Sequence, residues 1–220
     1  MSGELIPTAI GGTVVIRLAA DVGESAAWLS QLDGASGDGD HGVNMRTGME
    51  LAAERVESGA SISDALRKVG DTLLEDVGGA MGPLYGVFFL ALADASAGRE
   101  WLDAECVRAM LAGGAEAVIE LGGASVGDKT LVDVLVPTVE AFEGALAANE
   151  RFVVALGTAA DTAEQRRDAT KEMVARVGRA ARAGERSRGH IDAGAASCAL
   201  ILVAICSVFA ENIQSEAIAS

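Results

Sequence analysis

Glycine-rich breaks divide this chain into eight stretches that each have the composition of a helix. The chain holds only 3 prolines, and only 4% of its residues are aromatic, which favours helices over strands. Because the connections between neighbouring stretches are short, we expect an all-α fold of roughly antiparallel helices. No proline- or serine-rich linker interrupts the sequence, so residues 1–220 are expected to form a single domain. The predicted helices span residues 12–31, 43–57, 62–77, 82–97, 103–121, 131–148, 158–183 and 193–213.

The third predicted helix has the clearest boundary and packing face. Ser61, with Asp64 three residues later, resembles a capping box. Spacings of three and four residues then predict one buried stripe, made of Ile62, Ala65, Leu66, Val69, Leu73 and Val77. The seventh stretch is more polar and is expected at the outer edge, with a thin stripe of Ala159, Ala163, Met173, Val174 and Val177.

The eighth predicted helix raises the question of a membrane span. It carries no charged residue from Ala193 to Ala210, which approaches the length that crosses a bilayer. Much of it is alanine, serine, cysteine and glycine, whose transfer energies are small, and Asp192 and Glu211 lie at its two ends. We therefore prefer a helix buried on most sides in the domain to a tail anchor.

Charge and cysteine content restrict the function classes. A formal net charge of −15 and a pI near 4.5 argue against nucleic acid and against anionic membrane surfaces as partners. Cys106, Cys198 and Cys206 are too few, and too apolar in setting, for a disulfide framework, so buried free thiols are expected. The sequence near Glu4 shows no basic run before an apolar segment, and we expect the protein in the cytoplasm.

Residues 32–45, LDGASGDGDHGVNM, carry the densest group of polar side chains. Asp33, Asp38 and Asp40 would repel one another unless a cation lies between them, which suggests a site for a hard divalent metal. The glycines among them allow the backbone to approach a ligand closely. Mg²⁺ prefers a few carboxylates together with phosphate oxygens. A Mg-nucleotide site is therefore the favoured hypothesis.

Three other interpretations of this loop were compared with the sequence. An EF-hand that starts at Asp38 would have Val43 at loop position 6 and Met49 at position 12, where glycine and glutamate are required. A zinc site would require several histidines or cysteines, and only His41 is close by. A solvated acidic turn remains the simplest alternative.

Four ordered segments resemble the L subunit, or nucleotide-binding subunit, of dihydroxyacetone kinase. The pattern Asp-x4-Asp-x-Asp-His-Gly-x-Asn-Met is carried in full by residues 33–45. Residues 78–86 (GGAMGPLYG) resemble the second segment and residues 127–130 (GDKT) the third. Residues 184–187 (GERS) and 189–194 (GHIDAG) resemble the fourth. Because these segments cover nearly the whole chain, the combined match is specific, although each segment alone is weak.

The resemblance implies a fold and a set of ligand-binding residues. The family's fold is an eight-helix barrel that binds the nucleotide at one end, in the loops between helices. Asp33, Asp38 and Asp40 are implied to bind Mg²⁺, with two ions expected, and the ions bridge the phosphates of ADP or ATP. The residues implied to contact the nucleotide are His41, Gly42, Val43, Asn44, Ala80, Met81, Gly122, Leu131, Arg179, Asp192, Ala193 and Gly194.

Two of these positions depart from the family's common pattern. Met81 replaces a usual serine, so a backbone contact survives but a hydroxyl contact does not. Ala193 replaces a usual proline, which makes that loop less rigid.

Several of the implied residues also have ordinary structural explanations. Leu131 could belong to the core, His41 could be a helix cap or a satisfied core histidine, and Arg179 could belong to a solvated basic face. Gly78 and Gly79 could be a helix C-cap, and residues 128–130 could be an N-cap with a solvated lysine.

The resemblance implies a phosphotransferase subunit. It would hold Mg-ADP or Mg-ATP and pass a phosphoryl group to dihydroxyacetone, or a related short ketose, on a separate K subunit. A phosphoenolpyruvate-dependent phosphocarrier is a second expected partner, and a homodimer is expected. Two other functions remain open: a nucleotide-loaded module that docks on a transcription regulator, and the ATP-binding domain of fatty acid kinases. That last group usually has threonine where His41 stands.

Overall fold

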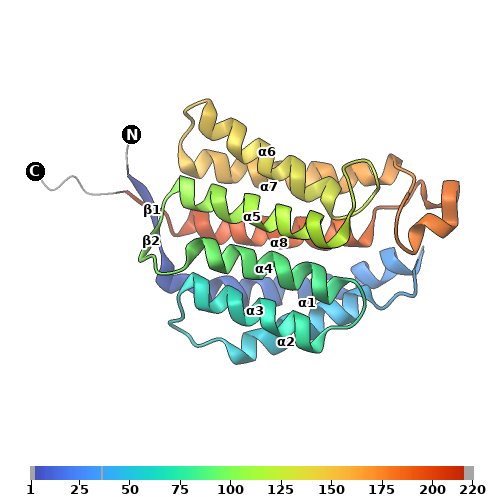
Figure 1. Cartoon of the computed structure of the whole chain (residues 1–220), viewed down its shortest axis with the longest axis horizontal. Helices are drawn as coiled ribbons and strands as arrows, with labels where there is room; N and C mark the ends of the chain where they lie inside the picture. The colour runs from blue at the N-terminus through green and yellow to red at the C-terminus, as the bar shows by residue number, and fades with distance from the viewer. Residues whose placement is uncertain (1–2, 36, 216–220) are drawn as a thin grey trace, which may run out of the picture.

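The computed structural model describes residues 3–35 and 37–215, and within them eight α-helices lie side by side along the long axis (Figure 1). The all-α prediction is confirmed. The α-helices are α1 (Gly11–Gly34), α2 (His41–Arg55), α3 (Ile62–Asp76), α4 (Met81–Ser96), α5 (Ala104–Gly122), α6 (Val132–Ala147), α7 (Phe152–Ala169) and α8 (Ala193–Glu211). Three 3₁₀ helices are also present, η1 (Thr8–Ile10), η2 (Thr170–Glu172) and η3 (Ala180–Ser187).

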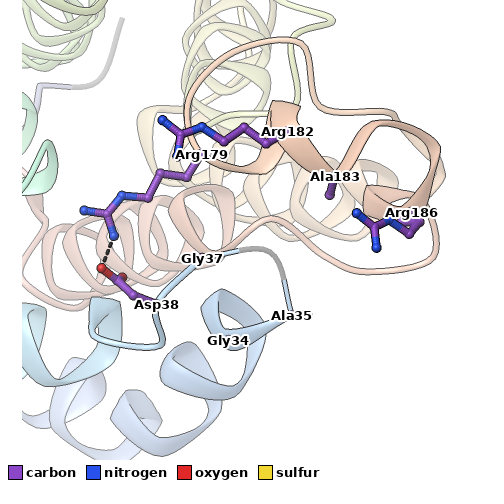
Figure 2. A pocket seen from close by; sticks show the side chains of 8 residues that line it. All are labelled: Gly34, Ala35, Gly37, Asp38, Arg179, Arg182, Ala183 and Arg186. Atoms are coloured by element: carbon purple, nitrogen blue, oxygen red, sulfur yellow. Dashed lines mark hydrogen bonds and ion pairs between the residues drawn. The ribbon is translucent and has the colours of Figure 1, made fainter.

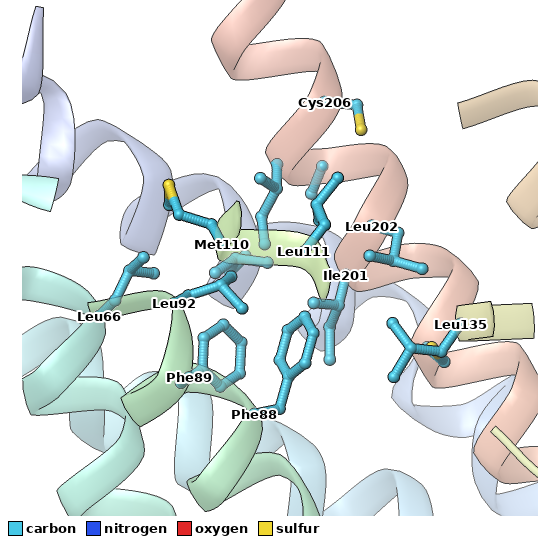
Figure 3. Packing of buried hydrophobic residues seen from close by; sticks show 14 of the residues in the cluster. Leu66, Phe88, Phe89, Leu92, Met110, Leu111, Leu135, Ile201, Leu202 and Cys206 are labelled. Carbon is cyan, nitrogen blue, oxygen red and sulfur yellow. The ribbon is translucent and has the colours of Figure 1, made fainter. Parts of the chain in front are cut away.

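Helix α8 supplies a central part of the hydrophobic core. It packs against α1, α6 and α7, and it buries residues on all sides, from Ala193 to Phe209. Ile201 and Leu202 belong to the same buried cluster as Phe88 and Phe89, part of which is drawn in Figure 3. Within the described residues, α8 is the one helix that is long and apolar enough to cross a membrane, but 67% of its most apolar window is buried inside the protein. Core packing therefore accounts for its apolar composition.

Helix α3 matches its prediction closely. The hydroxyl oxygen of Ser61 accepts a hydrogen bond from the backbone N–H of Asp64 at 3.1 Å, which caps the helix as predicted. The apolar stripe that begins at Ile62 and ends at Val77 is buried in full. Because the capping residues and the apolar stripe indicate the same helix, the start of α3 could be predicted from the sequence.

The seventh helix was predicted in the wrong place. The expected range was 158–183, whereas α7 begins at Phe152 and ends at Ala169. Its buried stripe starts earlier than expected, with Phe152, Ala155 and Leu156. The chain leaves the helix through η2, Met173 is extended (φ −87°, ψ 158°), and Gly178 has a φ of 69°. Met173, Val174 and Val177, which were expected on its stripe, lie beyond the helix.

In the part of the chain that the structure describes, three short strands, which were not predicted, lie at one end of the bundle. They are β1 (Glu4–Pro7), β2 (Trp101–Leu102) and β3 (Gln214–Ser215), and they pair antiparallel in the order β2-β1-β3. Ile6 pairs with Leu102, and both side chains are fully buried. Figure 1 shows this sheet at the opposite end of the bundle from η3.

Candidate functional site

The four glycine-containing segments that resemble the family, residues 32–45, 78–86, 127–130 and 184–194, meet at the end of the bundle that lies away from the sheet (Figure 1). In an up-and-down bundle, every second connection lies at the same end. The connections α1–α2, α3–α4, α5–α6 and α7–α8 alternate in this way, and they surround a cavity of about 480 Å³. The predicted site residues that line it are Asp33, Asp38, Asp40, His41, Asn44, Ala80, Met81, Gly122, Leu131, Arg179, Asp192, Ala193 and Gly194.

Two predicted residues, Gly42 and Val43, do not line this cavity. A Cβ on Gly42 would lie 1.9 Å from the carbonyl oxygen of Ala26, so this glycine permits the close approach of α1 and α2. The side chain of Val43 is 49% exposed. Gly42 therefore has a packing role that the motif alone does not reveal.

The predicted acidic cluster is assembled in the structure. Asp33, Asp38 and Asp40 can each place a carboxylate oxygen within 4.8 Å of the other two. Asp33 lies at the end of α1, and its carboxylate accepts the backbone N–H of Gly39 at 2.8 Å, which folds the loop back on itself. Gly39 has a φ of 79°, a conformation that favours glycine. An oxygen-only donor set of three carboxylates fits a hard cation such as Mg²⁺.

Arg179 reaches across the site to the acidic cluster. Figure 2 shows its guanidinium donating to the carboxylate of Asp38, although the two residues lie 141 positions apart in the sequence. Arg182 and Arg186 line an adjoining hollow of about 750 Å³. Arg188 instead forms an ion pair with Glu185 at 3.2 Å. Among these arginines, Arg179 is thus the one that contacts the predicted metal ligands.

His41 is a buried member of a hydrogen-bonded group that the sequence did not predict. Its Nε2 lies 2.9 Å from the hydroxyl of Ser197, which in turn lies 2.7 Å from the hydroxyl of Tyr85. Both hydroxyl oxygens also lie within hydrogen-bond distance of the carbonyl oxygen of Gly194, at 3.2 Å for Tyr85 and 3.1 Å for Ser197. Burial lowers the pKa of His41, and the charge of Asp33 partly opposes this. A neutral imidazole therefore connects α2, α4 and α8 next to the cavity.

The first turns of three helices lie at the wall of the cavity. The first residues of α2, α4 and α8 are His41, Met81 and Ala193, and all three line it. The N–H groups of a first helical turn have no partner within the helix, and the positive end of the dipole favours anions. Three such helix starts around one cavity form a strong anion-binding arrangement.

An apolar slot adjoins these helix starts. Its walls include Leu84, Val118, Ala124, Leu131 and Val132, and Leu131 is only 6% exposed. A Cβ on Gly122 would lie 3.1 Å from the side chain of Leu84, which leaves little room for any other residue there. The apolar lining of the slot is suited to a ligand group that is itself largely apolar.

The loop between α5 and α6 is shaped by contacts that the sequence does not predict. The carboxylate of Asp133 accepts the backbone N–H groups of Gly127 (2.5 Å) and Thr130 (2.7 Å). Asp128 caps the turn at Ser125 instead of helix α6. The alternative of a solvated Lys129 is excluded, because this residue is only 3% exposed and its ammonium donates to three backbone carbonyls. No local sequence signal marks a lysine for burial.

The loop before α8 contains a carboxyl group with a shifted pKa. Asp192 is the N-cap of α8, and its carboxylate accepts the backbone N–H of Ala195 at 2.8 Å. Burial raises the pKa of this group to about 6. Polar groups with shifted pKa values in a cavity are typical of functional sites.

Comparison with known proteins identifies a family. Residues 35–207 match the DAK2 domain. The chain is 44% identical over 172 residues to DhaL, the ADP-binding subunit of PEP-dependent dihydroxyacetone kinase from Escherichia coli (strain K12), across 77% of this chain and 82% of that protein. It is 39% identical over 189 residues to DhaL, the ADP-binding subunit of a PTS-dependent dihydroxyacetone kinase from Lactococcus lactis subsp. lactis (strain IL1403), across 85% and 90%.

A solved structure shares the same fold. The dihydroxyacetone kinase from C. freundii in complex with AMP-PNP and Mg²⁺ matches with a TM-score of 0.65 and 23% sequence identity, over 92% of this chain and 34% of that one. At this level of identity, the likeness concerns the fold alone. The sequence matches and the fold agree, and the chain therefore belongs to the DAK2 domain family, together with the DhaL subunits of dihydroxyacetone kinases.

Proposed function

We propose that this chain is the nucleotide-binding subunit of a dihydroxyacetone kinase. It holds Mg-ADP or Mg-ATP and passes the terminal phosphoryl group to dihydroxyacetone, or a related short ketose, on a separate K subunit. The observation that carries this proposal is the convergence of three helix starts and three carboxylates on one cavity with an apolar slot. The description of two relatives as ADP-binding subunits supports the choice of nucleotide.

Asp33, Asp38 and Asp40 would hold Mg²⁺ in this proposal. Three carboxylates within 4.8 Å of one another, together with phosphate oxygens, fit a pair of ions that each keep several waters. Bound Mg²⁺ offsets the charge that gathers on a transferring phosphoryl group. The AMP-PNP and Mg²⁺ present in the C. freundii structure support this ligand pair.

The remaining site residues would orient the nucleotide. The helix starts at His41, Met81 and Ala193 would bind the phosphates, and Arg179 would turn from Asp38 to a phosphate oxygen. The adenine would occupy the slot lined by Gly122 and Leu131. The catalytic contribution of this chain is then positioning and electrostatic stabilisation, as phosphoryl transfer requires.

The proposal also includes the source of the phosphoryl group and the partner proteins. The names of the relatives, PEP-dependent and PTS-dependent, favour ADP that stays bound and is rephosphorylated in place by a phosphocarrier subunit. The K subunit is the second partner, and the chain is proposed to form a homodimer in the cytoplasm. Its cysteines are free and buried, as expected for a reducing compartment.

Two measurements test this function. Mass spectrometry under native conditions on the purified protein should detect retained ADP, whereas freely exchanging nucleotide would indicate ATP as the substrate. Turnover should then be measured after addition of a K subunit and dihydroxyacetone. Phosphorylated ketose supports the proposal. Nucleotide binding without any turnover would instead support the alternative of a regulatory module, for which the departure at Met81 is the motivating feature.

A further inference from the structure

Lys129 occupies an unusual environment between α5 and α6. Its ammonium donates to the carbonyl oxygens of Ser187 at 2.5 Å, His190 at 2.7 Å and Met173 at 3.2 Å. An ammonium group has three donors, so these contacts use all of them. The residue is 3% exposed and has a φ of 63°. Its side chain is therefore fixed by one set of contacts, and its backbone adopts the left-handed conformation that is uncommon for a residue other than glycine.

The three acceptors all belong to the irregular segment 173–190 between α7 and α8. This segment contributes Val177, Gly178, Arg179 and Ala180 to the wall of the cavity. It contains no α-helix, and η3 is interrupted at Gly184 (φ 55°, ψ −131°). A segment that has neither an α-helix nor a strand depends on contacts with the rest of the protein for its position. The position of Arg179 therefore depends on such contacts.

Lys129 provides the charged contacts between the α5–α6 loop and this segment. Elsewhere, Arg179 of the segment pairs with Asp38, and Arg188 donates to the carbonyl of Glu172. A weaker tie joins the same parts of the chain as Lys129, because the backbone N–H of Arg176 donates to the carbonyl of Asp128. The backbone N–H of Ala175 donates to Ser187 within the segment itself. Hydrogen bonds from a charged donor are stronger than those between neutral groups. Burial lowers the pKa of Lys129, and the carboxylate of Asp192 opposes that shift. Removal of the ammonium would leave three carbonyls without this donor.

We propose that Lys129 is a positioning residue that fixes segment 173–190 so that Arg179 extends over the acidic cluster. Thr130 and Leu131, which follow Lys129 directly, line the apolar slot. Lys129 thus links the wall of that slot to the segment that carries the arginine. The effect on ligand binding rests on the proposed nucleotide function, whereas the effect on the segment does not.

The test compares Lys129→Met with Lys171→Met. Lys171 lies in η2, next to the same segment, and is exposed, so its substitution makes the same chemical change without loss of a buried contact. Limited trypsin digestion should cleave the Lys129→Met protein faster at Arg179, Arg182 and Arg186, while Lys171→Met and the wild type are cleaved at similar rates. Circular dichroism establishes that the helices are intact. If Lys129→Met does not fold, Lys129→Gln replaces it.

Calorimetry with Mg-ADP then separates positioning from general stability. Lys129→Met should weaken affinity by about tenfold in the wild-type background and by less than about threefold in an Arg179→Ala background, because the two residues act together. An equal loss in both backgrounds, or wild-type affinity in Lys129→Met, would overturn the proposal. If the wild-type chain binds no Mg-ADP, the proposed function fails, and the trypsin rates alone decide the role of Lys129: unchanged cleavage refutes it.

Discussion

Several side chains that line the cavity carry charges whose mutual repulsion or burial lowers the stability of the folded protein. Asp33, Asp38 and Asp40 bring three negative charges together. Asp192 is a different case, because burial raises the pKa of its carboxyl group. Groups that reduce stability and line a cavity are expected where binding depends on them. Substitution of such residues should therefore separate stability from function.

Asp40→Asn should show this separation. It removes one of three like charges, so the metal-free protein should melt about 2 °C higher, while Mg-ADP affinity falls by at least about tenfold, since a ligand is lost. Thermal melts in EDTA and calorimetry measure the two effects. Asp161→Asn, an exposed position on α7, is the matched control and should change neither. A lower melting temperature for Asp40→Asn in EDTA would contradict the account.

Asp192→Asn should change how stability depends on pH. The folded-state pKa of about 6 lies above the ordinary value of 3.8, so the unfolded chain releases this proton first as pH rises. The stability that the protonated carboxyl contributes is therefore present below about pH 4 and is lost by about pH 6. Asparagine keeps the N-cap but does not ionise. We expect the variant to match the wild type at about pH 4 and to exceed it by about 2 kcal/mol at pH 7.

Urea unfolding of both proteins, without metal or nucleotide, measures this difference. The charge of Lys129 lowers the pKa of Asp192, and the charge of Asp133 raises it. Neither residue is changed by the substitution. A stability difference that is constant from pH 4 to pH 7 would show that burial does not raise the pKa of Asp192.

At the scale of elements, the sequence predicts what depends on local pattern and misses what depends on distant contacts. Helix α3 is predictable because a cap and an apolar stripe coincide. The end of helix α7 is not predictable in this way, because the charged residues after Ala169 have good helix propensity. In the structure, the buried Thr170 accepts a hydrogen bond from the backbone N–H of Asp192, and the chain leaves the helix there. The group of His41, Tyr85 and Ser197 likewise depends on residues that are far apart in sequence.

The contact between α1 and α2 gives a prediction at this scale. Gly42→Ala would place a methyl group 1.9 Å from the carbonyl oxygen of Ala26, so the helices must separate, at a cost of about 2 kcal/mol or more. Gly23→Ala is the matched control, because a Cβ there meets nothing within 4 Å, and it should stabilise α1 by about 0.5–1 kcal/mol. Chemical unfolding should therefore show a lower free energy of unfolding than the wild type for Gly42→Ala and a higher one for Gly23→Ala. Equal changes in the free energy of unfolding for the two variants would disprove the close contact between α1 and α2.

At the scale of the whole molecule, the two ends of the bundle differ in role. The small sheet closes one end, where Glu4 is buried and forms an ion pair with Arg151. The four glycine-rich connections occupy the other end. The motif order and an up-and-down arrangement suffice to predict that these loops share one end. The sequence does not predict the distances among them, because these depend on how the helices pack.

The central claim is that Asp33, Asp38 and Asp40 bind Mg²⁺ so that the phosphates of a nucleotide are held against three helix starts. Calorimetric titration of the protein, freed of retained nucleotide, with ADP in the presence of Mg²⁺ or of EDTA tests it most directly. We expect binding with Mg²⁺, and affinity at least about a hundredfold weaker in EDTA. Equal affinity in the two conditions, or no binding in either, would contradict the account.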